Sequence, residues 1–97
     1  EIRKRASCLH LQDSSKVFNT ELVAALELMN MVEVAETLAV SAAHRKESRG
    51  AHTCRDFPHR DDQTYLYHTL AYRTDDGPRL DRKEVALGHW EPQERKY

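Results

Sequence analysis

The stretch after residue 50 contains the side chains that could do chemistry. His52, Cys54 and His59 lie close together, and imidazole and thiolate groups are the usual ligands of zinc. Structural zinc sites commonly use two close ligand pairs separated by a loop, and no second pair follows here. Cys54 could also act as a nucleophile, but no neighbouring feature predicts a lowered thiol pKa. The spacing therefore favours neither metal binding nor catalysis.

Two further patterns also point away from an active site. Asp61 and Asp62 are adjacent, and acids in such a polar stretch are more typical of turns and caps than of an acid–base pair. The 3 glycines are scattered over 97 residues, so they cannot form a phosphate-binding loop. We expect no catalytic residue, no metal site and no cofactor bound by this chain alone.

Composition is that of one small domain with little stability to spare. A chain of 97 residues buries only about 60–65% of the surface that it exposes when unfolded. Its net charge of −1 comes from interspersed acids and bases, which argues against nucleic-acid binding. No apolar run approaches the ~20 residues of a membrane span. The two cysteines, Cys8 and Cys54, are too few for a disulfide framework, which favours a reducing compartment.

The identity of the first residue indicates how the chain was produced. An initiator Met is rarely removed before a residue as large as Glu1. We therefore expect a piece of a longer protein, with functional residues outside this sequence.

A long helix is the strongest local prediction. Asn19 is a favourable N-cap, and Phe18 and Val23 are spaced for a hydrophobic staple. Helix-forming residues then continue without Gly or Pro to Glu47, and Gly50 is placed to end the helix in a left-handed conformation. We predict a helix from about residue 19 to 47.

This helix is apolar around most of its circumference. One stripe runs along it and a second set widens the stripe: Leu22, Leu26, Met29 and Val32, then Leu28, Ala35, Leu38 and Ala42. Such a helix is normally buried on several sides. We expect the chain by itself to oligomerise or to expose a hydrophobic patch.

The remaining residues complete the predicted fold. Residues 51–64 have no helical or strand period, residues 65–72 and 79–87 read as two strands, and residues 75–78 supply turn chemistry between them. The fold class is mainly α: a helical hairpin or three-helix arrangement built on the long helix, then an ordered loop and a small C-terminal β hairpin. We expect one domain over residues 1–97, with a helical part (1–50), a motif loop (51–64) and a hairpin and tail (65–97).

Several short motifs carry a resemblance to a known family. They are ESRGAH at 47–52, RDFP at 55–58, RDD at 60–62, HTL at 68–70, FNTEL at 18–22, ALEL at 25–28 and ERKY at 94–97. In order and spacing they resemble the C-terminal domain of the succinate dehydrogenase and fumarate reductase flavoprotein subunit. The resemblance spans nearly the whole chain.

The resemblance implies a parent enzyme that binds FAD and interconverts succinate and fumarate in the tricarboxylic acid cycle and electron transport. It implies an FAD-binding domain in the same subunit and an iron–sulfur subunit as partners. It also implies a peripheral position, on the cytoplasmic side of the bacterial inner membrane or the matrix side in mitochondria. The residues that bind flavin and dicarboxylate in the family lie upstream of this domain, so the chain alone should not be an enzyme.

The resemblance also assigns roles within the loop. It implies that Arg49 faces the flavin and supports its attachment, that Gly50 allows close backbone approach, and that His52 orients the loop. The alternative for Arg49 is a surface ion pair with Glu47 or Asp56. The family usually has an Arg and an acid at positions 54 and 55, where this chain has a Cys and an Arg, so no role is carried over to them.

Two rival interpretations remain open. The C-terminal domain of L-aspartate oxidase has a similar Ser-Arg-Gly loop, although the motifs at 60–62 and 68–70 favour succinate dehydrogenase. A free-standing helical interaction module without any flavin is the other alternative.

Overall fold

The computed structural model describes residues 1–93, so the ERKY motif at 94–97 lies outside the described residues. The chain divides into two compact units, Glu1–Leu38 and Ala39–Tyr97. The elements in chain order are α1 (Ile2–Ala6), α2 (Thr20–His44), β1 (Tyr67–Tyr72) and β2 (Arg79–Glu84). The predicted long helix and C-terminal β hairpin are confirmed.

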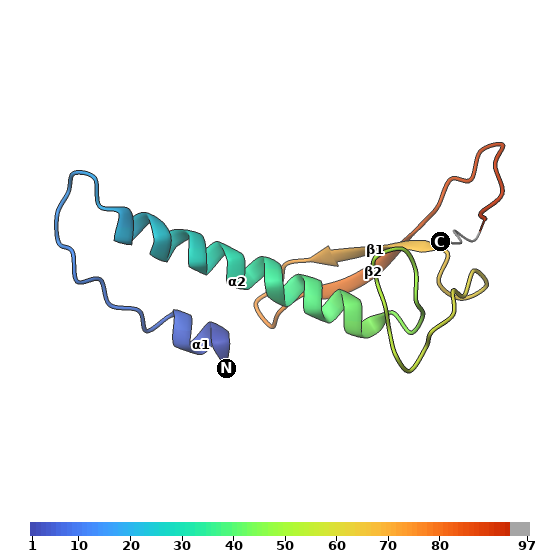
Figure 1. The fold of residues 1–97 in the computed structure, drawn as a ribbon, viewed down its shortest axis with the longest axis horizontal. Coiled ribbons are helices and arrows are strands. Elements are labelled where there is room, and N and C mark those ends of the chain that lie inside the picture. Colours follow the sequence, from blue (N-terminus) through green and yellow to red (C-terminus); the bar gives the residue numbers. More distant parts are fainter. Residues whose placement is uncertain (94–97) are drawn as a thin grey trace. The chain divides into compact units, whose positions relative to one another are not determined.

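In the first unit, the short helix α1 folds back beside α2 (Figure 1). The guanidinium of Arg3 makes this contact: it lies 3.3 Å from a carboxylate oxygen of Glu33 and 3.0 Å from one of Glu36. These pairs are half exposed and so contribute little, about 0–1 kcal/mol each.

The start of α2 is capped as predicted. The side-chain oxygen of Asn19 accepts a hydrogen bond from the amide of Leu22 at 2.8 Å, which satisfies one of the free donors of the first turn. The carboxylate of Glu21 accepts bonds from the amides of Gln12 and Asp13, the latter at 2.7 Å. The predicted staple is wrong, because Phe18 is 95% exposed and takes a left-handed backbone with φ of 53°.

The C-terminal end of α2 differs from the prediction. The helix ends at His44, three residues before the predicted end at Glu47. Gly50 does adopt the left-handed conformation, with φ of 57°, but not as a helix cap. Instead it opens a tight turn in which Arg49 and His52 exchange two backbone hydrogen bonds, of 2.9 and 3.0 Å.

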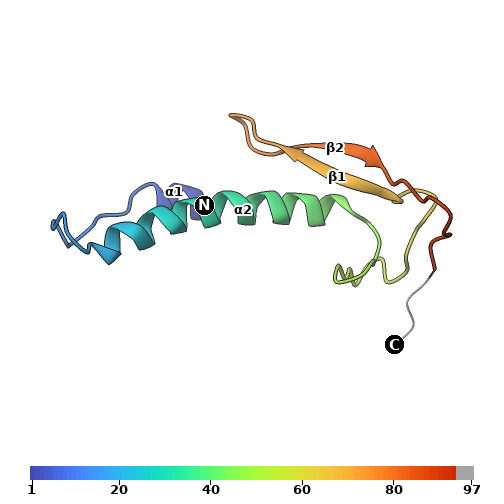
Figure 2. The same ribbon diagram turned by 90° about the horizontal axis from the view of Figure 1, so that it is seen from above.

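The second unit contains the hairpin (Figure 2). Strands β1 and β2 pair antiparallel from Tyr67↔Glu84 to Tyr72↔Arg79. The connection is closed by Thr74 and Gly77: the amide of Gly77 donates to the carbonyl of Thr74, and the hydroxyl of Thr74 donates to the carbonyl of Gly77. A two-stranded sheet is marginally stable by itself, so it needs support from elsewhere.

Burial is sparse throughout the described residues. None of their hydrophobic side chains is buried, and Glu47 is the one residue of any type that is. On α2, Leu22 is 42% exposed, Leu28 37% and Leu38 70%, which confirms the expected apolar surface. Within residues 1–93, no helix has both the length and the apolar character needed to cross a bilayer.

Candidate functional site

The site is built around the buried carboxylate of Glu47, which is 0% exposed. Three residues donate to it. Arg45 donates through Nη1, Arg49 donates through Nε at 2.8 Å and Nη2 at 3.0 Å, and the amide of Asp61 donates at 2.9 Å. A buried anion is tolerated only when it is paired and hydrogen-bonded, and Glu47 is both.

These contacts set the ionisation of Glu47. Burial by itself raises the pKa of the carboxyl, but the hydrogen bonds from Arg49, the Asp61 amide and Arg45, with the charge of Arg49, bring the pKa down to about 2. Glu47 is therefore ionised at neutral pH.

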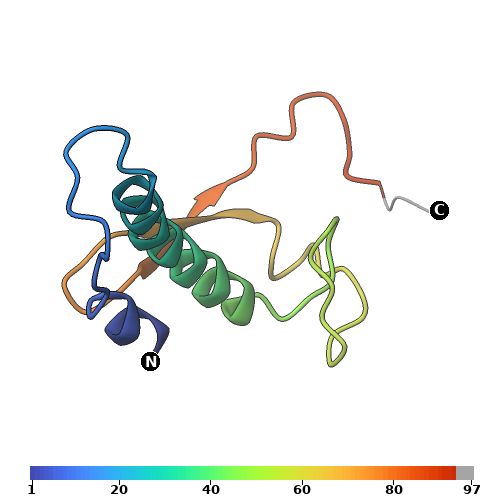
Figure 3. The ribbon, with the colours of Figure 1, turned by 60° about the vertical axis from the view of Figure 1, so that its left-hand side comes forward.

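Arg45 connects the end of α2 to the hairpin. Its Nη1 donates to the carbonyl of Tyr65 at 2.9 Å, and its Nη2 donates to the carbonyl of Tyr67 at 2.7 Å and the hydroxyl of Thr69 at 3.2 Å. The same guanidinium lies 5.0 Å from the centre of the Tyr67 ring, within cation–π range. Arg45 thus joins the end of α2 to the residues at the start of β1. Figure 3 shows the loop that connects these two elements in sequence.

Arg49 joins this cluster to a second acid. Its Nη2 lies 2.6 Å from Asp62, whose other oxygen lies 2.8 Å from Arg60. The hydrogen bonds from Arg49 to Glu47 are the main cause that raises its pKa above the usual value. Among the described residues Nη1 of Arg49 has no partner. With three arginines and two acids, the network carries one excess positive charge.

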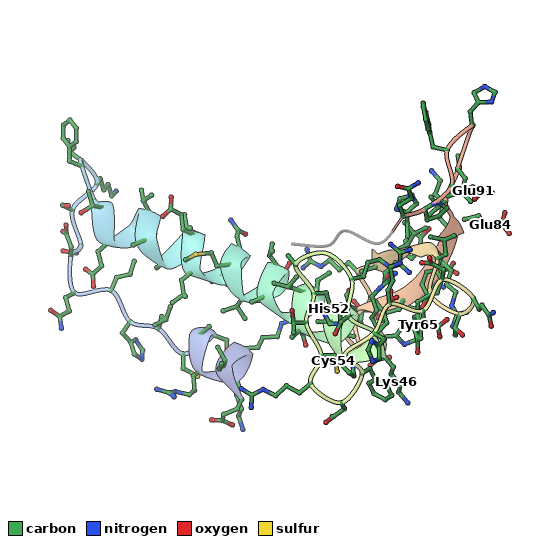
Figure 4. The ribbon with its side chains drawn as sticks, turned by 45° about the vertical axis from the view of Figure 1, so that its right-hand side comes forward. Lys46, His52, Cys54, Tyr65, Glu84 and Glu91 are labelled. Carbon is green, nitrogen blue, oxygen red and sulfur yellow. The ribbon has the colours of Figure 1, made fainter. Side chains whose placement is uncertain are left out.

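The loop around Arg49 is held by hydrogen bonds between side chains and backbone groups. The hydroxyl of Ser48 donates to the carbonyl of Phe57 at 2.8 Å and accepts from the amide of Cys54 at 2.9 Å. The ring of His52 lies 3.2 Å from the carbonyl of Arg45, so His52 connects the turn to the helix end (Figure 4). Polar contacts therefore hold this loop, since none of the described hydrophobic side chains is buried.

Asp61 and Asp62 have separate roles. The carboxylate of Asp61 accepts bonds from the amides of Thr64 and Gln63, both at 3.0 Å, and these bonds lower its pKa. This confirms Asp61 as a turn-capping residue. Asp62 is instead an ion-pair partner of arginine.

Beside the network lies a pocket of about 460 Å³, lined by Arg45, Arg49, Tyr65 and Tyr67 among others. The hydroxyl of Tyr67 is buried and has no hydrogen-bond partner among the described residues. In residues 1–93 no group of three or more His, Cys, Asp or Glu side chains is placed to hold a metal. Cys54 and the exposed Cys8 are both free thiols.

The family model described as "Fumarate reductase flavoprotein C-term" matches residues 1–97. The chain belongs to this family.

Relatives of this C-terminal domain are flavoprotein subunits. The chain is 44% identical to the fumarate reductase flavoprotein subunit of Mycobacterium tuberculosis over 99% of its own length and 17% of the relative. It is 43% identical to the succinate dehydrogenase flavoprotein subunit of Rickettsia conorii, over 90% of the chain and 15% of the relative. The chain therefore spans about a sixth of these relatives.

A solved structure agrees with the fold. A point mutant of Escherichia coli quinol fumarate reductase FrdA superposes with a TM-score of 0.87 at 41% identity, over 95% of this chain and 16% of that one. These similarities support the first interpretation over the L-aspartate oxidase alternative, and they count against a helical module unrelated to flavoproteins.

The site residues predicted from the sequence lie together in this domain. Arg49, Gly50 and His52 form one turn next to the buried Glu47. The ion pair with Glu47 exists, but it is buried, and the second acidic partner of Arg49 is Asp62 rather than the exposed Asp56. The flavin-facing role of Arg49 stays a prediction.

Sequence reasoning missed Arg45, which has the most partners in the network. The predicted helix over residues 19–47 places Arg45 near the end of the helix and predicts no tertiary contact for it. Its position is the signal that could have found it, because it is the first Arg or Lys after the apolar run of α2 and lies two residues before an acid.

Proposed function

We propose that this chain is the non-catalytic C-terminal domain of a succinate dehydrogenase or fumarate reductase flavoprotein subunit, and that residues 1–97 act as one domain. In the parent subunit it packs on the FAD-binding domain and supports flavin attachment through the turn at residues 48–52. The parent subunit works with an iron–sulfur subunit, at the cytoplasmic face of the bacterial inner membrane or its matrix-side equivalent. One observation carries the proposal: Arg49 is held rigidly by Glu47 and Asp62 while its Nη1 has no partner among the described residues.

The donor set of the turn fits a flavin edge but not a whole FAD. The chain has no glycine-rich loop for the pyrophosphate, so the FAD-binding domain must hold most of the cofactor. A guanidinium is always charged and its N–H donors lie in one plane, which suits the electron-rich N1 and C2-carbonyl edge of a flavin.

In the parent protein FAD supplies the chemistry, by taking up two electrons from succinate or delivering them to fumarate. The residues of this chain position one cation for that cofactor. Glu47 fixes the plane of the Arg49 guanidinium through two hydrogen bonds, and Gly50 supplies the left-handed backbone of the turn, with φ of 57°, which L side chains rarely adopt. His52 holds the turn against the carbonyl of Arg45.

The experiment that tests this role compares substitutions of Arg49 in a full-length subunit. We would replace the aligned segment of the M. tuberculosis relative with this chain and introduce Arg49→Lys and Arg49→Ala. A preorganised donor in a site sheltered from water contributes about 2.7–4 kcal/mol. Lysine keeps the charge but loses the planar donors, so we expect covalent flavin to fall at least tenfold in both variants. Fluorescence of the denatured flavoprotein band measures it.

Arg55→Lys and Arg55→Ala are the matched controls, because Arg55 lies in the same loop and is exposed. They should keep normal covalent flavin. Normal covalent flavin in both Arg49 variants would remove Arg49 from the flavin site and leave the domain a structural role only.

A further inference from the structure

Arg45 uses both terminal nitrogens of its guanidinium. Nη1 donates to the carboxylate of Glu47 and to the carbonyl of Tyr65, the latter at 2.9 Å. Nη2 donates to the carbonyl of Tyr67 at 2.7 Å and to the hydroxyl of Thr69 at 3.2 Å. Each of these nitrogens carries two N–H groups, so the four hydrogen bonds use all of them. The Arg45 side chain is only 14% exposed, so these bonds are largely sheltered from water.

The bond to Glu47 connects Arg45 to Arg49. Oε1 of Glu47 accepts from Nη1 of Arg45 and from Nε of Arg49, so the two guanidiniums share one oxygen. Oε2 of Glu47 accepts from Nη2 of Arg49 at 3.0 Å. These two bonds fix the planes of Glu47 and Arg49 relative to each other. Arg45 adds a link from this pair to the hairpin, because its other three acceptors lie in residues 65–69.

We propose that Arg45 is a positioning residue for the Arg49 guanidinium. It holds Glu47, and through Glu47 it sets the place of Arg49 relative to the start of β1. This rests on the proposed function, in which Arg49 serves the flavin. It adds a role for the hairpin in flavin attachment, because residues 65–69 supply the acceptors that hold Arg45.

Lysine cannot replace Arg45 in this role. Its three N–H donors all lie on one nitrogen, whereas the acceptors around Arg45 are reached from two nitrogens of a planar group. Arg45→Lys therefore keeps the positive charge beside Glu47 and loses part of the link to the hairpin. Misplacing a positioned group by about 1 Å can slow a reaction by up to ~10²-fold.

Four proteins test the proposal, all made in the full-length M. tuberculosis subunit that carries this chain in place of its aligned segment. They are the parent chimaera, Arg45→Lys, Arg49→Ala and the double variant. The rate of covalent attachment is measured after FAD is added to each apo-protein, by fluorescence of the denatured band. Lys46→Ala is the matched control, because Lys46 is adjacent in sequence and exposed.

We expect Arg45→Lys to slow attachment about fivefold or more when Arg49 is present, and less than about twofold in the Arg49→Ala background. Lys46→Ala should leave the rate unchanged. A residue needed only for folding would slow attachment by the same factor in both backgrounds, because a misfolded subunit attaches no flavin whatever residue stands at position 49. Equal factors, or a normal rate in Arg45→Lys, would overturn the proposal.

Thr69→Val is the milder variant, and it decides the question if Arg45→Lys does not fold. Valine has the shape of threonine but lacks the hydroxyl that accepts from Nη2 of Arg45 at 3.2 Å. We expect attachment to slow about twofold or more with Arg49 present and to be unchanged in the Arg49→Ala background. The same slowing in both backgrounds, or none, would overturn the proposal.

The positioning role and the proposed function fail in different ways. Normal attachment in Arg49→Ala would overturn the proposed function, and the positioning role of Arg45 with it. Slow attachment in Arg49→Ala together with a normal rate in Arg45→Lys would overturn the positioning role alone and leave the flavin role of Arg49 standing.

Discussion

At the scale of single residues, Glu47 controls the stability of the second unit. In Glu47→Gln the two guanidiniums of Arg45 and Arg49 lose the anion between them, and breaking a buried ion pair costs about 3–5 kcal/mol. We expect the free energy of unfolding, measured with urea by circular dichroism, to fall by roughly that amount. Glu36→Gln is the control, because its pair with Arg3 is half exposed and should cost at most about 1 kcal/mol. Equal effects would contradict the central role of Glu47.

The depressed pKa of Glu47 predicts acid sensitivity. Its folded pKa of about 2 lies below the ordinary 4.5, so the folded state binds the proton less well than the unfolded state does. The resulting stabilisation is complete above about pH 4.5 and is lost as the pH falls towards 2, with a total of up to about 3 kcal/mol. Urea titrations at several pH values should show this loss, and the part of it that Glu47 contributes should be absent from Glu47→Gln.

Single residues were predictable only where a local pattern determined them. The side chain of Asn19 caps α2 through a bond to the amide of Leu22, three residues away. The contacts of Arg45 reach 20 to 24 residues along the chain, to Tyr65 and Thr69, and no local periodicity encodes them. The motif resemblance located the turn at Arg49, but it did not predict that Asp62 would be the second acidic partner.

At the scale of elements, the contribution of the N-cap of α2 to the free energy of unfolding should be measurable. We expect Asn19→Ala to cost about 1 kcal/mol, because the amide of Leu22 loses its acceptor. Helix content at 222 nm and the urea midpoint report the loss. Asn30→Ala is the matched control, since an exposed position in the middle of a helix gains slightly from alanine. A loss of the same size in Asn30→Ala would mean that the cap contributes nothing.

Element type was predictable and element ends less so. The turn before β2 follows from Gly77 and Pro78, and the unbroken helix formers predict α2. The helix ends early because Arg45 is bound to the hairpin and Glu47 must turn inward to meet Arg49. Both causes lie in tertiary contacts, which override the helix propensity of residues 45–47.

At the scale of the whole molecule, the chain without further partners should associate. None of the described hydrophobic side chains is buried, and Val34 and Leu38 are 68% and 70% exposed. We expect sedimentation velocity to detect species larger than 11.3 kDa at high concentration. Val34→Glu with Leu38→Glu should reduce that association, and the charge-preserving pair Val34→Ala with Leu38→Ala should reduce it less. A monomer at all concentrations would contradict the expectation.

The sequence separation between Arg45 and its partners also determines when these contacts can form during synthesis. Its partners are the carbonyls of Tyr65 and Tyr67 and the hydroxyl of Thr69, the last of them 24 residues further along the chain. A ribosome adds about 5–20 residues per second, so roughly 1–5 s pass between the synthesis of Arg45 and that of Thr69. Closing a loop of about that length then takes well under a millisecond. Translation, rather than chain diffusion, therefore determines how long the nascent chain waits with Glu47 and its arginines still in water.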